Sequence, residues 1–433
     1  MIFSVIIVLY LLFIFSCFCI SHVIFNTITE RKKALKIFAI SSFFYALFAL
    51  FAYGAYLTNN NSFFQYPDQE NFYAMSQYLG GLFNVKSIFN ACFIDPADIV
   101  LTENQGAYFY LGSTSYFANH YLGGNNVLFQ ILNISFLAAL IPVFVFRILT
   151  YFVSLKSAFR ASIVFVFCSY VFYYSPWILR DIHIALLYVM GLSILFSPFK
   201  VYRLIILSVL VFITTFFRME HGLFMLFMPL LYIYEQTKYN KIIHYVFIII
   251  AWGICMILSV VIIPEIISIQ AGLDHYVDYT QTAAEEGGLG KYILRLPTGI
   301  RQIVTVLFSQ FSPFPSWNLA INAQNIPQFV IGLIQMIAPA FWFVVWFCVI
   351  QIISFKDYRK LLPNILIFSG LAFIVFLLAN SSNMNPRRLI CMYPVLYLFF
   401  VIAKEKYPLY IKKNTKRGFM AYLALCLIYI IIK

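Results

Sequence analysis

The sequence predicts an all-α fold: a polytopic membrane protein in which residues 1–433 form one integral membrane domain with about twelve transmembrane helices. Hydrophobic residues make up 63% of the chain and charged residues only 10%, whereas soluble domains carry roughly 25% charged residues. The apolar runs continue over about 20 residues, the length that a helix needs to cross a bilayer. They do not alternate as the strands of a membrane barrel would.

Apolar runs define the predicted spans in chain order. The first run lacks both a basic leading segment and a small-residue cleavage site, so we expect it to be retained as a span. The spans are 2–25, 37–57, 126–146, 161–177, 182–198, 204–217, 222–236, 243–264, 326–353, 361–380, 389–403 and 418–432.

Lysine and arginine residues predict the orientation of these spans. One set of connecting loops holds twenty of the 29 basic residues, and the positive-inside rule assigns that set to the cytoplasm. Twelve of the sixteen acidic residues fall on the other side. An even number of spans would place both termini outside. The two long segments, 58–125 and 265–325, are then extracytoplasmic, and we expect the working surface there.

Each long external segment contains a stretch that predicts a helix at the membrane surface. Residues 104–124 are too polar to cross the membrane and rich in tyrosine, which favours an interfacial or re-entrant helix. Residues 291–308 follow three glycines and form an amphipathic stretch, which predicts a surface helix or a mobile lid. This second stretch supplies Arg295 and Arg301.

Three charged clusters lie at the outer ends of spans, where an ionisable group is costly unless it meets water or a partner. Two of them repeat a pattern, because RDIH and RMEH both place arginine and histidine three residues apart, on one face of a helix. Arginine binds phosphate through two parallel hydrogen bonds, so the clusters predict an anion site. Structural ion pairs and contacts with lipid headgroups are the alternatives. The candidate residues are Arg180, Asp181, His183, Arg218, Glu220, His221, Arg387 and Arg388.

Two carboxylates in the first external segment are candidates for acid–base chemistry. Asp68 and Glu70 follow the second predicted span. A carboxylate there could accept a proton from a sugar hydroxyl or bind a divalent cation. A solvated loop with ordinary acidic residues is the alternative.

Several functional classes lack their sequence signals. The chain has no nucleotide-binding loop of the Walker A type, no GxSxG, no HExxH and no CxxC. The net charge of +13 follows the topology and does not indicate nucleic-acid binding. An external enzyme has no access to nucleotide-sugars, so its donor would be linked to a lipid.

The chain resembles the polytopic glycosyltransferases that use polyprenyl-linked sugars, the GT-C superfamily. Within that superfamily it is most similar to bacterial O-antigen or capsular repeat-unit polymerases of the Wzy type. The resemblance rests on about a dozen spans, charged external loops and local residues. These residues are Asp68, Glu70, Arg180-Asp181, Arg218-Met219-Glu220, Ser312-Pro313-Phe314-Pro315 and Asn385-Pro386-Arg387-Arg388.

The resemblance implies an inner-membrane enzyme whose site faces the periplasm. Asp68 would be the catalytic base, with Glu70 as second choice, and the external arginines would hold a lipid diphosphate. The expected substrate is an undecaprenyl-diphosphate-linked oligosaccharide. Membrane lipids and a chain-length regulator are the other expected partners. No cofactor is required, although a divalent cation at Asp68 and Glu70 is compatible with this prediction.

Three other functions stay open at this point, and one of them is a non-catalytic scaffold for the assembly of the cell envelope. The acidic first loop also fits a transferase that takes single sugars from polyprenyl phosphate. A flippase for lipid-linked sugars is the alternative from another class, although transporters carry their charges near the membrane midplane and have paired repeats. Charged groups at the outer ends of spans favour an enzyme.

Overall fold

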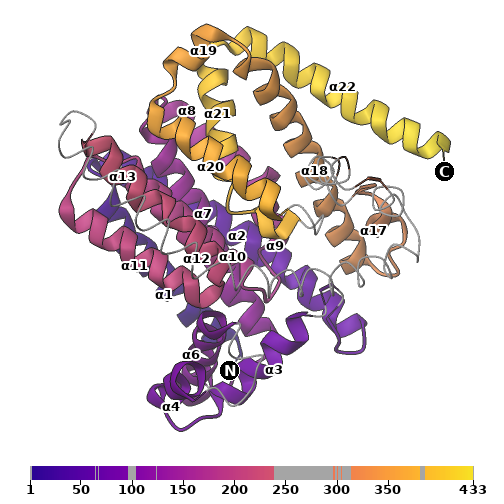
Figure 1. The fold of residues 1–433 in the computed structure, drawn as a ribbon. Coiled ribbons are helices and arrows are strands. Elements are labelled where there is room, and N and C mark those ends of the chain that lie inside the picture. The colour runs from indigo at the N-terminus through magenta and orange to yellow at the C-terminus, as the bar shows by residue number, and fades with distance from the viewer. Residues whose placement is uncertain are drawn as a thin grey trace.

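The computed structural model describes residues 2–63, 65–66, 68–95, 104–122, 124–237, 314–380 and 386–432, with isolated residues between 296 and 304. All regular secondary structure in these residues is helical (Figure 1). The helices are α1 (Ile2–Ile24), α2 (Ile28–Thr58), α3 (Asp68–Gly80), α4 (Val85–Phe89), the π-helical turn η1 (Asn90–Ile94), α6 (Gln105–Tyr121), α7 (Val127–Thr150), α8 (Leu155–Cys168), α9 (Tyr170–Tyr174), α10 (Asp181–Leu195), α11 (Val201–Phe217), α12 (Met219–Met225), α13 (Phe227–Thr237), α17 (Asn318–Ile321), α18 (Ile326–Ile353), α19 (Lys356–Leu361), α20 (Asn364–Asn380), the 3₁₀ turn η3 (Pro386–Leu389), α21 (Tyr393–Lys406) and α22 (Pro408–Ile432).

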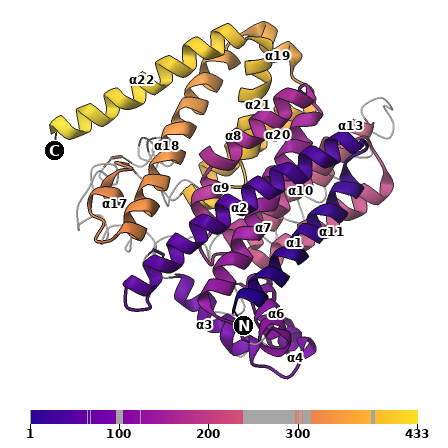
Figure 2. The same cartoon turned by 180° about the vertical axis from the view of Figure 1, so that it is seen from behind.

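Helix α7 is the centre of the bundle. Almost every side chain from Val127 to Leu149 is buried, because a helix that is apolar all round must be covered on all sides. Helix α2 packs against it, and the Ser41 hydroxyl donates to the Ala139 carbonyl at 3.0 Å. Figure 2 shows α1 and α2 lying beside α7 from behind.

The ends of the long helices are fixed by side-chain caps. Thr27 and Glu30 form a reciprocal capping box at the start of α2. Asn126 caps α7 and Asn325 caps α18, each accepting a hydrogen bond from the backbone N–H three residues on. These caps satisfy N–H groups that the first helical turn would leave unpaired.

Four of the described helices are long and apolar enough to cross a membrane: Ile6–Ile24, Ile28–Thr58, Val127–Thr150 and Ile326–Ile353. The described part of the protein is all-helical, and its apolar helices indicate that the protein associates with a membrane. Eleven of the predicted spans overlap described helices, while 243–264 lies outside the described residues. Several of those helices are shorter than a crossing requires, so the number of about twelve crossings stays a prediction.

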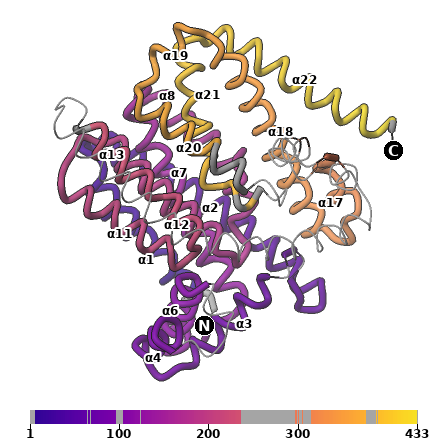
Figure 3. The backbone as a smooth tube through the Cα atoms, in the orientation of Figure 1, coloured from indigo at the N-terminus to yellow at the C-terminus, as the bar shows by residue number. Residues whose placement is uncertain are grey.

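Loops that the lysine and arginine pattern assigns to one side also lie at one end of the bundle. Helix α19 and the beginning of α22 lie at the top of Figure 1, while α3, α4 and α6 lie together at the bottom. The stretch predicted as a surface helix at 104–124 is helical as α6. The predicted helix at 291–308 falls almost entirely outside the described residues. The tube in Figure 3 shows α22 extending away from the body of the molecule.

Candidate functional site

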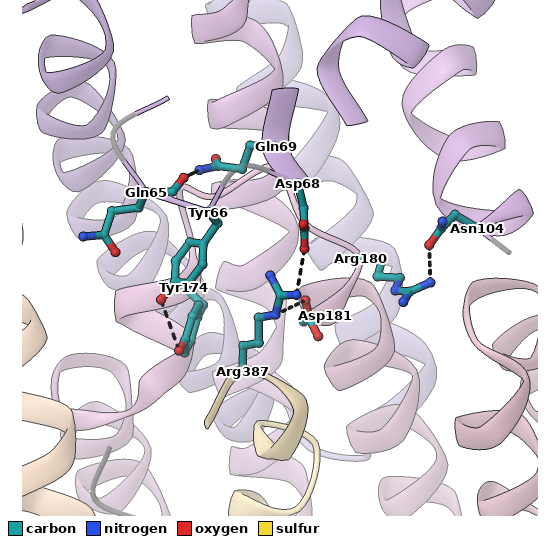
Figure 4. Close-up of polar contacts among 9 residues, drawn as sticks. All are labelled: Gln65, Tyr66, Asp68, Gln69, Asn104, Tyr174, Arg180, Asp181 and Arg387. Carbon is teal, nitrogen blue, oxygen red and sulfur yellow. Dashed lines mark hydrogen bonds and ion pairs between the residues drawn. The ribbon is translucent and has the colours of Figure 1, made fainter. Parts of the chain in front are cut away.

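Three segments that are far apart in the sequence meet at Arg387. Its guanidinium Nη2 lies 2.7 Å from Oδ2 of Asp68, the first residue of α3. Its Nε lies 4.0 Å from Oδ2 of Asp181, the first residue of α10 (Figure 4). The ring of Tyr66 lies beneath the same guanidinium, 5.7 Å from its centre. The 3₁₀ turn before α21 thus supplies one cation to two helix N-termini, whose dipoles favour carboxylates.

Burial differs strongly within this ion-pair group. The side chains of Arg387 and Asp181 are 17% and 8% exposed, whereas that of Asp68 is 51% exposed. Burial by itself would lower the pKa of Arg387, but the Asp181 and Asp68 carboxylates outweigh it and raise this pKa above its ordinary value. Arg387 is therefore permanently charged, and Asp68 is the carboxylate that solvent or a ligand can reach.

Arg180 and Arg218 form the second part of the site, and each stands directly before a helix. Arg180 precedes α10 and its guanidinium donates to Oδ1 of Asn104, at the start of α6. Arg218 precedes α12, is 10% exposed, and lies 3.4 Å from the half-exposed Glu220. Burial lowers the pKa of Arg180, and the nearby positive charge of Arg218 lowers it further. Two guanidinium groups that repel each other are suited to share an anion.

Packing around the first external segment holds Asp68 in place. The side-chain Oε1 of Gln69 accepts a hydrogen bond from the backbone N–H of Ile178, just ahead of α10, at 3.0 Å. The neighbouring Gln65 side chain accepts from the Tyr173 hydroxyl, which accepts in turn from Gln335 of α18, each at 2.9 Å. Hydrogen bonds to α9 and α18 therefore position the residues on either side of Asp68.

The two histidines of the repeated pattern are packed among aromatic rings. His183 is buried between Tyr110 and Phe217, with ring centres 4.7 and 5.1 Å away. His221 meets the edge of Tyr188 at 5.8 Å. Because Phe217 directly precedes Arg218, the ring of His183 packs against the segment that carries the second arginine–histidine pair.

Other predicted site residues lie apart from the cluster or outside the described part. Glu70 accepts a hydrogen bond from the Ser62 hydroxyl at 2.7 Å, away from Arg387. Among the described residues, no group of three or more histidine, cysteine or acidic side chains gathers as metal ligands would. Arg295, Arg301 and the Arg388 side chain lie outside the described residues.

Sequence reasoning missed several residues that build the site. Asn104, Gln69 and Tyr174 carry no charge and belong to no repeated pattern. Tyr174 pairs its hydroxyl with that of Tyr66 at 3.4 Å. Of these residues, only Asn104 could have been singled out from the sequence, because it stands at the start of a stretch predicted to be helical.

An apolar groove of about 900 Å³ extends as far as Phe217, the residue before Arg218. It runs between α1, η1, α6, α7 and α11 and is lined mainly by phenylalanine. Its lining includes Phe217, next to Arg218, and Tyr110, whose ring contacts His183. A polar seam crosses it where the Tyr110 hydroxyl donates to Asn133 at 2.8 Å. The apolar groove therefore reaches Phe217, the residue that directly precedes Arg218.

The fold and the site define a helical, membrane-associated protein with an ion-pair cluster at one end of its bundle. In comparisons with protein-family models, curated proteins and solved structures, the chain matches none of them.

Proposed function

We propose that this chain is a membrane glycosyltransferase with an outward-facing site, which polymerises undecaprenyl-diphosphate-linked oligosaccharide units into O-antigen or capsular polysaccharide. The observation that carries the proposal is the ion pair between a reachable carboxylate, Asp68, and Arg387 from a distant segment. Arg387 contacts Asp68 directly, and Arg180 is electrostatically coupled to both Arg218 and Arg387.

The reaction divides the site into two parts. A hydroxyl of the acceptor's terminal sugar attacks the anomeric carbon of the donor and passes its proton to Asp68. The bond from that carbon to the diphosphate oxygen breaks, and the lipid diphosphate leaves with the bonding electrons. Arg180 and Arg218 neutralise the negative charge that develops on this leaving group. Fixed positive charge of this kind is commonly the largest contribution to catalysis.

Arg387 acts through Asp68 and is a positioning residue. Its contact with Asp181, which is 8% exposed, fixes the guanidinium, and the guanidinium then orients Asp68 at 2.7 Å. The two carboxylates have different partners, because Asp68 contacts Arg387 while Glu70 accepts a hydrogen bond from Ser62.

The apolar groove supports a polyprenyl-linked substrate. A chain of isoprene units is long and apolar, and the groove beside Phe217 offers it a matching surface. The diphosphate at its head would then meet Arg218, the next residue in the chain. A substrate without a long apolar tail would leave this groove unused.

One observation also favours the single-sugar transferase as a second candidate. Arg180 and Arg218 are two guanidinium groups, enough to hold one phosphate as well as a diphosphate. A flippase is less well supported, because the cluster lies at helix ends and not midway along them.

Deletion of the gene in its native host, followed by complementation, tests the proposal. Surface glycan resolved on a gel should lose its ladder and regain it with the natural protein. Arg218→Ala should fail to restore the ladder although the protein reaches the membrane. Arg417→Ala, an exposed arginine of α22, is the matched control and should restore it.

Other outcomes separate the candidates. A ladder that persists without one side-branch sugar would identify the single-sugar transferase. Lipid-linked units stranded on the inner face would identify a flippase. A normal ladder with Arg218→Ala would contradict all versions of the proposed site.

A further inference from the structure

A second large cavity lies at the far end of α21 from Arg387. It has a volume of about 940 Å³ and opens between α8, α18, α21 and α22. Valine and phenylalanine side chains form its walls, among them Val164, Phe341 and Phe400. The proposed reaction uses none of these residues, so the cavity needs a separate explanation.

The rim of this cavity is strongly basic. Arg160, Lys404, Lys412 and Lys416 line it together with a single carboxylate, Glu405. Glu405 already accepts a hydrogen bond from the backbone N–H of Ser154 at 3.0 Å. Within the part of the chain that the structure describes, none of the four cations forms an ion pair. The cavity therefore combines an apolar interior with uncompensated positive charge at its mouth.

The placement of the lysines on α22 is specific to the cavity. Lys412 and Lys416 are four residues apart and share one helix face, which lines the cavity. Lys413 and Arg417 are the next residues along the same helix, are exposed, and do not line it. Helix α22 thus supplies two pairs of cations of equal charge, and only one pair faces the cavity.

We propose that this cavity binds an anionic phospholipid from the cytoplasmic leaflet. Its phosphate would rest on Lys404, Lys412 and Lys416, and an acyl chain would lie along the valine and phenylalanine walls. Basic pockets between membrane helices on the cytoplasmic side bind anionic headgroups in this way. The lysine and arginine pattern assigns all four rim cations to that side.

Charge and size favour a lipid over other occupants. An apolar helix from a second copy of the chain would leave the four cations without counter-charge. Free phosphate would leave the apolar walls uncovered. The volume of about 940 Å³ lies near the upper end of the ~300–1,000 Å³ range of small-molecule sites. It accommodates a headgroup and the first part of the acyl chains, while the rest remains in the bilayer.

Native mass spectrometry of the delipidated full-length protein tests this proposal. The protein is titrated with phosphatidylglycerol and with phosphatidylcholine of the same acyl chains. Phosphatidylglycerol should bind more tightly to the natural protein. The double variant Lys412→Gln/Lys416→Gln should weaken that binding about tenfold or more. Each lysine contributes to the attraction of an anionic lipid, and the variant removes both contributions. The control Lys413→Gln/Arg417→Gln removes the same charge from the same helix and should bind normally.

A further variant tests the contribution of the apolar wall, where the acyl chain would lie, separately from that of the rim cations. Val164→Trp fills the apolar wall while every rim cation remains, and it should also weaken phosphatidylglycerol binding. Circular dichroism and gel filtration show whether each variant is folded. Three results would overturn the proposal: equal binding of the two lipids, equal loss with the control pair, or displacement of the lipid by inorganic phosphate alone.

Discussion

Arg387 contacts two carboxylates whose exposures differ sixfold. The difference assigns a structural role to one carboxylate and leaves the other accessible for chemistry. Asp181 is 8% exposed and Asp68 is 51% exposed. Asp181 contacts the Arg387 guanidinium inside the protein, whereas Asp68 contacts the same guanidinium and is open to solvent. A substrate hydroxyl can therefore approach Asp68 without disturbing the buried pair.

Removal of the shared cation should cost far more stability than removal of the outer carboxylate. Arg387→Ala should lower the free energy of unfolding by about 3 kcal/mol, because it leaves Asp181 buried without its cation. Asp68→Asn should cost less than about 1 kcal/mol, as is typical of an exposed pair. Denaturant unfolding of the purified protein in detergent measures both changes. Equal losses would show that Asp68 is also structural.

At the scale of the helices, close packing of α3 against α6 places Asp68 relative to Asn104. A Cβ atom added at Gly80 would lie 2.5 Å from Cβ of Ser115 on α6. The next residue, Gly81, has only its own turn nearby, at 3.4 Å or more. Adjacent glycines therefore differ completely in the space around them.

This pair provides a matched test of the helix contact. Gly80→Ala should destabilise the protein by about 1–3 kcal/mol, because a new methyl group must force the two helices apart. Gly81→Ala should be neutral or slightly stabilising, since it only restricts the unfolded chain. Thermal unfolding in detergent compares the two. A neutral Gly80→Ala would mean that α3 and α6 do not touch at this point.

The apolar runs predict the helices well and their interruptions poorly. The run at 161–177 becomes two helices because the extended backbone of Ser169 separates α8 from α9. The run at 222–236 is divided near Leu226, and Pro229, which has no N–H to donate, lies in the first turn of α13. Hydropathy averages over about 20 residues, so a one-residue break does not register.

The site was predictable from its charges and only from them. Asp68, Arg180, Arg218 and Arg387 stand out because charge is rare in this chain. The partners of these side chains depend on tertiary packing. The sequence therefore does not show which of the two carboxylates, Asp68 or Glu70, contacts Arg387. Neutral supporting residues such as Gln69 resemble many other polar residues in the chain.

At the scale of the whole molecule, the distribution of charge and the arrangement of helices agree. The basic loops gather at one end of the bundle and α3, α4 and α6 at the other (Figure 1). This agreement predicts that the ion-pair cluster and the basic-rimmed cavity lie on opposite sides of a membrane.

Cysteine labelling in intact cells tests that orientation. Phe83, between α3 and α4, and Leu409, in the first turn of α22, are both highly exposed, at 86% and 82%. These elements lie at opposite ends of the bundle in Figure 1. With the exposed Cys19 replaced by serine, Phe83→Cys should react with a membrane-impermeant maleimide in intact cells. Leu409→Cys should react only after permeabilisation. The reverse pattern would place the proposed site on the cytoplasmic side, where nucleotide-sugars are accessible.

The central claim is that Asp68 is the base of an extracytoplasmic glycosyltransferase, and one measurement tests it most directly. A deletion strain is complemented with Asp68→Asn or with Glu70→Gln, and the length of its surface polysaccharide is resolved on a gel at matched protein levels in the membrane. Asp68→Asn should abolish the ladder, while Glu70→Gln, whose carboxylate is bonded to Ser62 and not to Arg387, should keep it. A full ladder with Asp68→Asn would contradict the claim.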